Sequence, residues 1–345
     1  RSAAKTTAVT AILDAERQAL GERLRAIVVC DHERASARLS ARLTGVLDER
    51  AGSARLVLER LLDDPVTAAL DPVLMTARTV ACGKDTAVAL LSWLAVEEPA
   101  LALTASPLEP DGRAVELTDG WSARRWVPLV TRFFETGGAR VLVGTRGLLG
   151  EGWDARAVNV VIDLTTATTA TAVVQIRGRG IRLDPDWPEK VTDTWTVTAV
   201  SPDHPKGAAD YARFVAKHRD FLAVDQDGDI TTGVPHVDPG FSPYAPPAVA
   251  DFDAFNARAL ARVRERAAAR ERWAIGEPYL DTTVHALRVR SARTPGPIGA
   301  DLAALAPPEL DSAPRRRRNV LAGLVGSASG VVAGLLGTVP SGALE

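Results

Sequence analysis

Apolar runs of strand length recur along residues 25–200. The runs are continuous rather than alternating, which is typical of strands buried on both faces of a parallel sheet. They lie at residues 25–30, 71–77, 100–104, 139–145, 158–164 and 194–200. Helical patterns lie between several of them, at residues 53–63, 84–95, 121–136 and 170–178. Strands that alternate with helices predict an α/β layered domain with right-handed crossovers, and we place this domain at residues 21–225.

The segments on either side of this domain have other patterns. Residues 1–20 are rich in alanine and predict a helix, which we interpret as a linker helix from a missing upstream lobe. Residues 226–250 are dense in proline and glycine, which is typical of a linker. Residues 251–290 predict a helical extension, and residues 291–345 form a proline-rich and then glycine-rich tail. The C-terminal extension is therefore expected to be mainly helical or irregular.

The composition is that of an ordinary globular protein, with 46% hydrophobic and 24% charged residues among 345. A net charge of -2 gives no global attraction to nucleic acid, so phosphate contacts must come from local arginine clusters. Cys30 and Cys82 have no metal-ligand spacing, and we interpret them as buried, reduced thiols of a cytoplasmic protein. The chain opens on Arg1 and its only methionine is Met75, so we expect that something upstream is absent.

Two segments, residues 141–154 and 175–185, carry most of the candidate chemistry. The first, VLVGTRGLLGEGWD, is an apolar strand followed by a glycine-rich turn. The second, QIRGRGIRLDP, follows a threonine-rich stretch. At the end of a parallel strand, Thr145 with its own N–H can hold a nucleic-acid phosphate. Asp154, just past the turn, can accept hydrogen bonds from a ribose.

Arg179 and Arg182 are three positions apart, so on a helix both would face the same side. Guanidinium groups presented from one face can stabilise a transferring phosphoryl group without losing their own charge. Glycine at 178 and 180 would keep side chains away, so that a nucleotide held by a neighbouring lobe can approach closely. The alternative interpretation is an exposed helix with ordinary salt bridges.

These two segments resemble motifs V and VI of the C-terminal RecA-like lobe of superfamily 2 helicases, which include DEAD/DEAH-like and restriction-type motors. GTRGLLGEGWD is similar to motif V, and QIRGRGIR is similar to motif VI in its Q-x-x-G-R-x-x-R form. Residues 72–94 have the position and shape of the strand and helix around motif IV, and residues 129–145 resemble the segment that precedes motif V. The resemblance covers about residues 70–225 and implies an α/β, parallel-sheet, RecA-like lobe of the P-loop NTPase type.

The resemblance also implies roles for individual residues. The catalytic arginine fingers would be Arg179 and Arg182. The nucleotide site would include Gln175, Gly178, Asp154, Gly152 and Glu151. The contacts to the nucleic-acid backbone would come from Thr145, Arg146, Thr76 and Arg78. The implied function is the second motor lobe of an ATP-dependent helicase or nucleic-acid translocase, a hydrolase whose nucleic acid we expect to be DNA rather than RNA.

The phosphate-binding loop of P-loop NTPases is missing from the sequence. No G-x-x-x-x-G-K-[ST] occurs, and we interpret residues 82–87, CGKDTA, as the start of a helix. Residues 26–33, AIVVCDHE, are similar to a Walker B strand that ends in acids. Too few residues precede them for the strand, loop and helix that should come first, so we do not expect a magnesium site at Asp31. We therefore expect no metal site here, and ATP with Mg²⁺ bound mainly by an upstream RecA-like lobe of the same polypeptide. The strand and helix at residues 21–70 exceed the minimal lobe of the family.

Arginine recurs at every fourth position of the helix predicted at residues 251–273. The members of this stripe are Arg258, Arg262, Arg266 and Arg270. Such a stripe could track a phosphate backbone. The interpretation that we favour is a solvated face on a helix that docks through its apolar residues, which are Phe252, Phe255 and Val263.

Other features leave alternatives open. A RecA-like lobe could be a non-catalytic interaction or scaffold module, because one fold hosts many functions. The tail at residues 320–339 is uncharged and follows four arginines, so membrane association through it is a less favoured alternative. For Trp153 we favour packing over base stacking, since the turn needs an apolar plug. The five scattered histidines have no ligand spacing and are expected to be structural.

Overall fold

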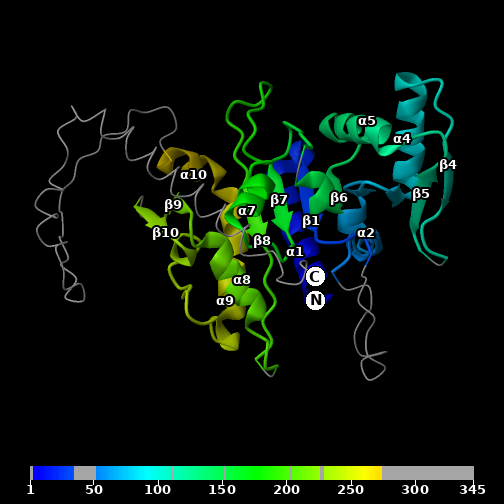
Figure 1. Ribbon diagram of the computed structural model, residues 1–345. Helices are drawn as coiled ribbons and strands as arrows, with labels where there is room; N and C mark the ends of the chain where they lie inside the picture. The colour runs from blue at the N-terminus through cyan, green and yellow to red at the C-terminus, as the bar shows by residue number, and fades with distance from the viewer. Residues whose placement is uncertain are drawn as a thin grey trace, which may run out of the picture. The chain divides into compact units, whose positions relative to one another are not determined.

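An eight-stranded mixed sheet forms the centre of the structure, a computed structural model (Figure 1). It describes residues 3–34, 52–110, 112–150, 152–202, 204–225 and 229–273, all within one unit, Arg1–Glu277. The strands are β1 (Ala26–Cys30), β2 (Val73–Met75), β3 (Val80–Gly83), β4 (Thr104–Pro107), β5 (Ala114–Thr118), β6 (Val141–Thr145), β7 (Val160–Asp163) and β8 (Asp193–Thr196). Their order across the sheet is β4-β5-β3-β2-β6-β1-β7-β8. The α/β class is confirmed.

The sheet has a parallel part and an antiparallel part. Strands β2, β6, β1, β7 and β8 pair in parallel with their neighbours. Strands β2, β3, β5 and β4 pair antiparallel in that order. The expected parallel sheet is therefore found for β2, β6, β1, β7 and β8, whereas the antiparallel part was not predicted. It was not predicted because β3 runs straight into a helix, and β4 is exposed along its length and carries no apolar run.

Strand β1 lies in the middle of the parallel part, between β6 and β7. Its five residues are all buried. The strand predicted at residues 25–30, in the part of the domain that exceeds the minimal lobe of the family, is thus central to the sheet. Among the described residues, no cluster of three or more His, Cys, Asp or Glu side chains could hold a metal ion.

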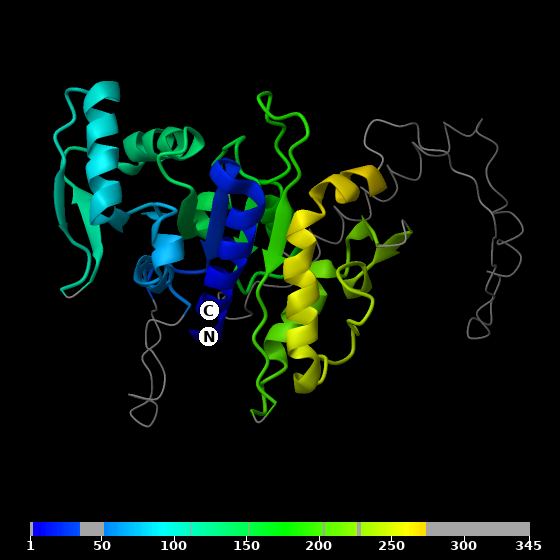
Figure 2. The same cartoon turned by 180° about the vertical axis from the view of Figure 1, so that it is seen from behind.

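The helices lie on both faces of the sheet (Figures 1 and 2). They are α1 (Ala3–Leu20), α2 (Ala54–Asp63), α3 (Pro65–Ala68), α4 (Lys84–Glu97), α5 (Ala123–Glu135), α6 (Arg146–Leu149), α7 (Ala170–Arg177), α8 (Ala209–His218), α9 (Phe252–Ala261) and α10 (Arg266–Arg272). Short 3-10 turns are η1 (Gly21–Arg23), η2 (Val234–His236), η3 (Val249–Asp251) and η4 (Arg262–Arg264). The helices predicted at 53–63, 84–95, 121–136 and 170–178 correspond to α2, α4, α5 and α7.

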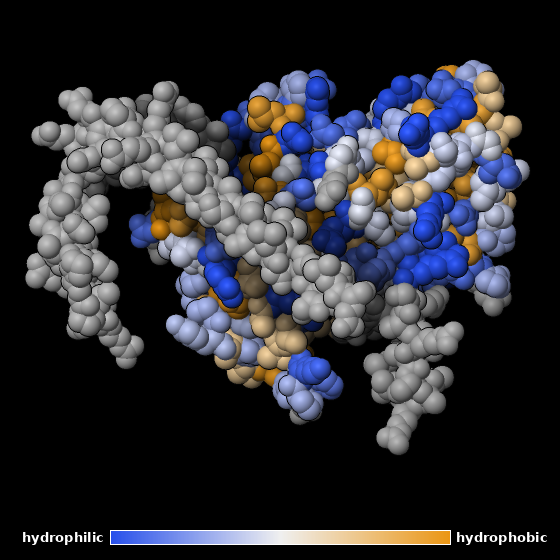
Figure 3. All heavy atoms as spheres, in the orientation of Figure 1, coloured by the Kyte–Doolittle hydropathy of each residue, from blue (hydrophilic) through white to orange (hydrophobic). Residues whose placement is uncertain are grey.

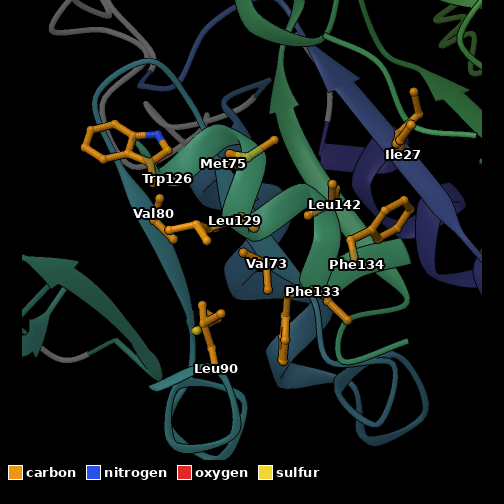
Figure 4. Packing of buried hydrophobic residues seen from close by; sticks show 14 of the residues in the cluster. Ile27, Val73, Met75, Val80, Leu90, Trp126, Leu129, Phe133, Phe134 and Leu142 are labelled. Atoms are coloured by element: carbon orange, nitrogen blue, oxygen red, sulfur yellow. The ribbon is translucent and has the colours of Figure 1, made fainter. Parts of the chain in front are cut away.

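Two hydrophobic layers result, one on each face of the sheet. Alternate residues of β1 point to opposite layers, with Ile27 and Val29 in one and Val28 in the other. The first layer is covered by α4, α5 and α7, and Figure 4 shows its packing around Trp126 and Phe134. The second is covered by α1 and α2. Helix α1, expected as a linker, packs its apolar side into this second layer.

The segment after α8 contains more structure than the predicted linker. Strands β9 (Leu222–Val224) and β10 (Ile230–Thr232) form a separate two-stranded antiparallel sheet. A small third cluster packs Tyr211 and Phe214 of α8 against Val234 of η2. Beyond it lie α9 and α10, within the predicted extension at residues 251–290.

Arg262 and Arg266 of the arginine stripe face the protein, whereas the side chain of Arg258 is 48% exposed. Arg258 and Arg262 both pair with Asp238, at 3.0 and 3.3 Å. Arg266 pairs with the fully buried Glu16 of α1 at 2.7 Å and with Asp193 of β8 at 2.8 Å. The expectation of a solvated arginine face is therefore wrong for Arg262 and Arg266, because acidic residues far away in the sequence supply their partners.

The C-terminal tail, including the stretch at residues 320–339, lies outside the described residues. Within the described ranges, no helix combines the length and the apolar character needed to cross a bilayer. Both cysteines are buried free thiols, as expected. Burial raises the pKa of the Cys82 thiol to about 12.

Candidate functional site

The carboxyl ends of β2 and β6 bring together one group of the predicted residues. The two strands are parallel neighbours, and Met75 pairs with Gly144. Thr76 and Thr145 therefore leave the sheet next to each other, each followed by an exposed arginine, Arg78 and Arg146. Ligands of open α/β sheets bind outside the carboxyl ends of the strands, so this edge is a candidate contact surface.

Thr76 is buried and its hydroxyl is already engaged. It donates a hydrogen bond to Glu33 at 2.7 Å and accepts from the backbone N–H groups of Arg78 and Thr79. Burial opposes ionisation of Glu33, but hydrogen bonds from Thr76, Arg55 and Thr79 outweigh it and lower the pKa of the carboxyl. Thr76 thus braces the turn between β2 and β3, and the side chain of Arg78 is the exposed group there.

The second group of predicted residues lies where the turn after α6 meets the segment after α7. Arg182 pairs with Asp154, with Nε 3.1 Å from Oδ1. Arg179 donates from Nη2 to the carbonyl of Gly150 at 2.6 Å and from Nη1 to the carbonyl of Trp153. The two motif segments are therefore in direct contact.

The two arginines differ in exposure. The side chain of Arg182 is 51% exposed, whereas Arg179 is 8% exposed. Burial and the neighbouring charge of Arg182 lower the pKa of Arg179. The expectation that one helical face presents both arginines is wrong, because α7 ends at Arg177. Arg179 follows in a turn, and Arg182 lies just after that turn in irregular chain.

The glycines between these arginines are explained by packing within the chain. A Cβ on Gly180 would lie 2.1 Å from the Thr192 side chain, and one on Gly178 would lie 2.8 Å from the Val174 carbonyl oxygen. Gly180 is buried. These contacts within the chain account for both glycines, so neither glycine is evidence for the close approach of a nucleotide.

The other predicted nucleotide-binding residues lie around the same turn or on α7. Gly152 is exposed and has a φ of 74°, a conformation that glycine adopts without strain. Asp154 is exposed and Gln175 is half-buried on α7. Glu151 lies outside the described residues. Trp153 is buried and donates from Nε1 to the Thr131 hydroxyl at 2.8 Å, which is the packing role that we expected.

A buried ion pair after β7 was not foreseen. The Nζ of Lys217 lies 2.6 Å from Oδ2 of Asp163, and both side chains are almost fully buried. Lys217 also donates to the carbonyl of Thr165 at 2.7 Å. The pair ties α8 to the carboxyl end of β7. In the sequence, the sign of a buried partner is Asp163, an acid within the apolar run at residues 158–164.

Two histidines, His218 and His236, lie in contact beside this pair, although they have no ligand spacing in the sequence. Nδ1 of His218 lies 3.2 Å from Nε2 of His236, and Nη2 of Arg177 lies 3.0 Å from Nε2 of His218. Burial and then the charge of Arg177 lower the pKa of His218 to about 2. The imidazole of His218 is therefore neutral near pH 7, and the residue is buried.

Comparisons with known proteins add little. No family model matches the sequence, and no curated protein matches it. A solved structure that resembles it is the Hef helicase domain of Pyrococcus furiosus, with 14% sequence identity and a TM-score of 0.29. The match covers 60% of this chain and 28% of that chain, so this chain spans under a third of its length. A TM-score of 0.29 is too low for the likeness to establish a common fold or activity.

Proposed function

We propose that this chain is the second, RecA-like motor lobe of an ATP-dependent superfamily 2 helicase or nucleic-acid translocase. The observation that carries the proposal is the contact between the two motif segments. Residues 150–154 and 178–182 are remote in sequence, yet Arg182 and Asp154 lie 3.1 Å apart on the surface. The cation and the acid that the resemblance assigns to a nucleotide are therefore adjacent.

The nucleotide would meet this lobe at Arg182 and Asp154. A guanidinium keeps its charge at all working pH values and can make two parallel hydrogen bonds to a phosphate. A carboxylate accepts hydrogen bonds from ribose hydroxyls. Both side chains are about half exposed, so a nucleotide bound to another lobe can reach them. Gln175 and Gly152 would lie at the margin of the same site.

ATP and Mg²⁺ would be held mainly by a first RecA-like lobe of the same polypeptide. Within the described residues, no cluster of acids fits a metal ion, and the sequence has no phosphate-binding loop. Arg182 and Asp154 fit the outer side of a nucleotide rather than a complete binding site. The contribution of this lobe is to neutralise phosphate charge from the side opposite the first lobe.

The nucleic acid, DNA in preference to RNA, would contact the carboxyl edge of β2 and β6. Arg78 and Arg146 are exposed there, and Thr145 is half-buried beside them. Phosphate contacts from arginine, threonine and backbone N–H groups position a strand without reading its sequence. Because the nucleotide surface and this edge share the segment 141–154, closure of the lobes on ATP would shift the strand.

A second candidate is a non-catalytic interaction module. Ile181 and Leu183, on either side of Arg182, are 77% and 86% exposed. Large apolar side chains exposed around one charged residue are typical of a protein contact. A scaffold module could bind a partner protein through this surface, and a first lobe of the same polypeptide could also pack against it. Figure 3 shows hydrophobic residues interspersed with hydrophilic ones on one face of the molecule.

The test is ATP hydrolysis by the polypeptide that carries this chain and the proposed first lobe, with and without DNA and RNA. We expect turnover that nucleic acid stimulates and that salt weakens. Arg78→Ala and Arg146→Ala should each reduce the salt dependence of nucleic-acid binding by about one phosphate contact. Arg113→Ala, at a 70% exposed side chain paired with Asp63, is the control. Binding of nucleic acid or protein without any turnover would favour the scaffold instead.

A further inference from the structure

Arg179 is the buried member of the arginine pair. Its guanidinium lies under the turn that follows α6 and donates to the carbonyls of Gly150 and Trp153. Each bond joins a charged donor to a backbone carbonyl, and such bonds are the stronger kind. To reach a nucleotide outside the lobe, Arg179 would have to break both bonds and leave two carbonyl groups of the turn without these donors.

Among the described residues of the turn, Gly150 donates its N–H to the Arg146 carbonyl at 2.8 Å. Two of these residues, Gly150 and Gly152, are glycines, and glycine has the largest conformational entropy to lose on folding. Trp153 anchors one end through the core and its bond to Thr131. Asp154 is the next residue, exposed and paired only with Arg182 among the described residues. The position of the Asp154 carboxylate therefore depends on what fixes the Gly150 and Trp153 carbonyls.

We propose that the two arginines divide the work, with Arg182 as the group that meets the phosphate and Arg179 as a positioning residue that fixes the turn carrying Asp154. This inference rests on the proposed function for the role of Arg182. The role of Arg179 in the turn stands on the two hydrogen bonds and its burial. It departs from the expectation that both arginines are fingers, because only one of them is accessible.

Hydrogen exchange of the backbone amides of Gly150 and Arg156 tests the positioning role in this chain without nucleotide. These amides flank the turn and donate to the Arg146 carbonyl at 2.8 Å and to Oε1 of Glu135 at 2.7 Å. Arg179→Ala should speed their exchange about tenfold or more, since two charge-assisted bonds that hold the turn are lost. Arg182→Ala, which removes an exposed ion pair, should leave exchange within about twofold. The amides of β1 serve as an internal reference for intact folding. Unchanged exchange of both amides in Arg179→Ala would overturn the proposal.

A conservative variant keeps the test decisive if Arg179→Ala fails to fold. Arg179→Lys replaces a planar fork, whose Nη1 and Nη2 each reach a different carbonyl, by a shorter side chain with a single nitrogen. We therefore expect this variant to hold the two carbonyls less tightly than arginine does. Arg179→Lys should give exchange intermediate between wild type and Arg179→Ala. Exchange in Arg179→Lys equal to that of wild type, with β1 intact, would contradict the two-carbonyl brace.

Kinetics of ATP hydrolysis in the two-lobed polypeptide separate the two roles. Loss of activity in Arg179→Ala should track loosening of the turn, and Arg179→Lys should restore part of both. Arg182→Ala should lower kcat with the turn still protected. Lost activity in Arg179→Ala with normal exchange would make Arg179 a direct contact and refute the inference. A wild type without any turnover would refute the proposed function and leave the exchange result standing.

Discussion

Arg182 and Asp154, which have 27 residues of chain between them, form an ion pair with Nε 3.1 Å from Oδ1. Both side chains are about half exposed, so the pair contributes little to stability, about 0–1 kcal/mol. A weak pair exchanges partners readily. A phosphate could take Arg182 and a ribose could take Asp154 at small cost, which is what a site completed by another lobe requires.

The buried pair of Lys217 and Asp163 should behave in the opposite way. Lys217→Met leaves the Asp163 carboxylate buried without its partner, and we expect a loss of about 3–5 kcal/mol in the free energy of unfolding. The double variant Asp163→Asn with Lys217→Met should recover part of that loss, because no unpaired charge remains. Urea denaturation measures both. A double variant as unstable as the single one would contradict this explanation.

The arginine stripe should matter only where it meets buried acids. Arg266→Met strands Glu16, which is fully buried, and we expect a loss of about 3 kcal/mol or more in unfolding free energy. Arg270→Met is the matched control, since Arg270 donates only one exposed bond, to the Pro188 carbonyl. It should change stability by less than about 1 kcal/mol. Equal effects of the two variants would mean that the acids under Arg266 do not need it.

Stability should depend on pH through Asp193. Burial, and secondly the nearby Glu16 carboxylate, raises the pKa of Asp193 to about 7, although Arg266 opposes the shift. The folded state therefore holds a proton that the unfolded chain releases near pH 4, so this stabilisation is present at low pH and is lost as pH rises through about 7. Asp193→Asn removes it.

The measurement for Asp193 is the difference in unfolding free energy between wild type and Asp193→Asn from pH 5 to pH 8. Titrating groups that do not interact with Asp193, His218 among them, cancel in this difference, whereas the contribution of Glu16 is measured together with that of Asp193. We expect wild type to lose roughly 1 kcal/mol or more relative to the variant across that range. A difference that stays flat, or that grows in favour of wild type, would show that Asp193 is ionised throughout.

Two glycines near the turn make a matched pair for packing. A Cβ on Gly144 would lie 2.7 Å from the Leu149 side chain and 2.8 Å from the Met75 carbonyl oxygen, which the sheet holds in place. Gly144→Ala should therefore cost about 1–3 kcal/mol. Gly147→Ala meets nothing within 4 Å on α6 and should be neutral or slightly stabilising. Thermal unfolding compares them, and tolerance of alanine at 144 would contradict the close packing of α6.

Much of the parallel part of the sheet could be predicted because burial on both faces makes β1, β6 and β7 apolar along their length. The antiparallel strands could not be, since β4 is exposed and β3 is short and continues into α4. The four-residue spacing of the arginine stripe predicted that its members share a face. It could not say that the face meets Glu16 and Asp193, because neither is near in sequence.

The candidate site was predictable in its residues and less so in their arrangement. Spacing and resemblance selected Arg179, Arg182 and Asp154. Arg179 is held in its buried position by hydrogen bonds to the backbone carbonyls of Gly150 and Trp153. Because every residue has a backbone carbonyl, the sequence does not indicate which carbonyls accept these bonds.

The most direct test of the motor-lobe proposal is the kcat of nucleic-acid-stimulated ATP hydrolysis in the two-lobed polypeptide, compared between wild type, Arg182→Ala and Arg125→Ala. Arg125 pairs with Glu98 at 3.0 Å and is similarly exposed, so it controls for loss of a surface ion pair. If Arg182 neutralises the transferring phosphoryl group, Arg182→Ala should lower kcat about 10³-fold or more while Arg125→Ala stays near wild type. Equal kcat in Arg182→Ala and wild type would contradict the proposal that this lobe completes an ATP site.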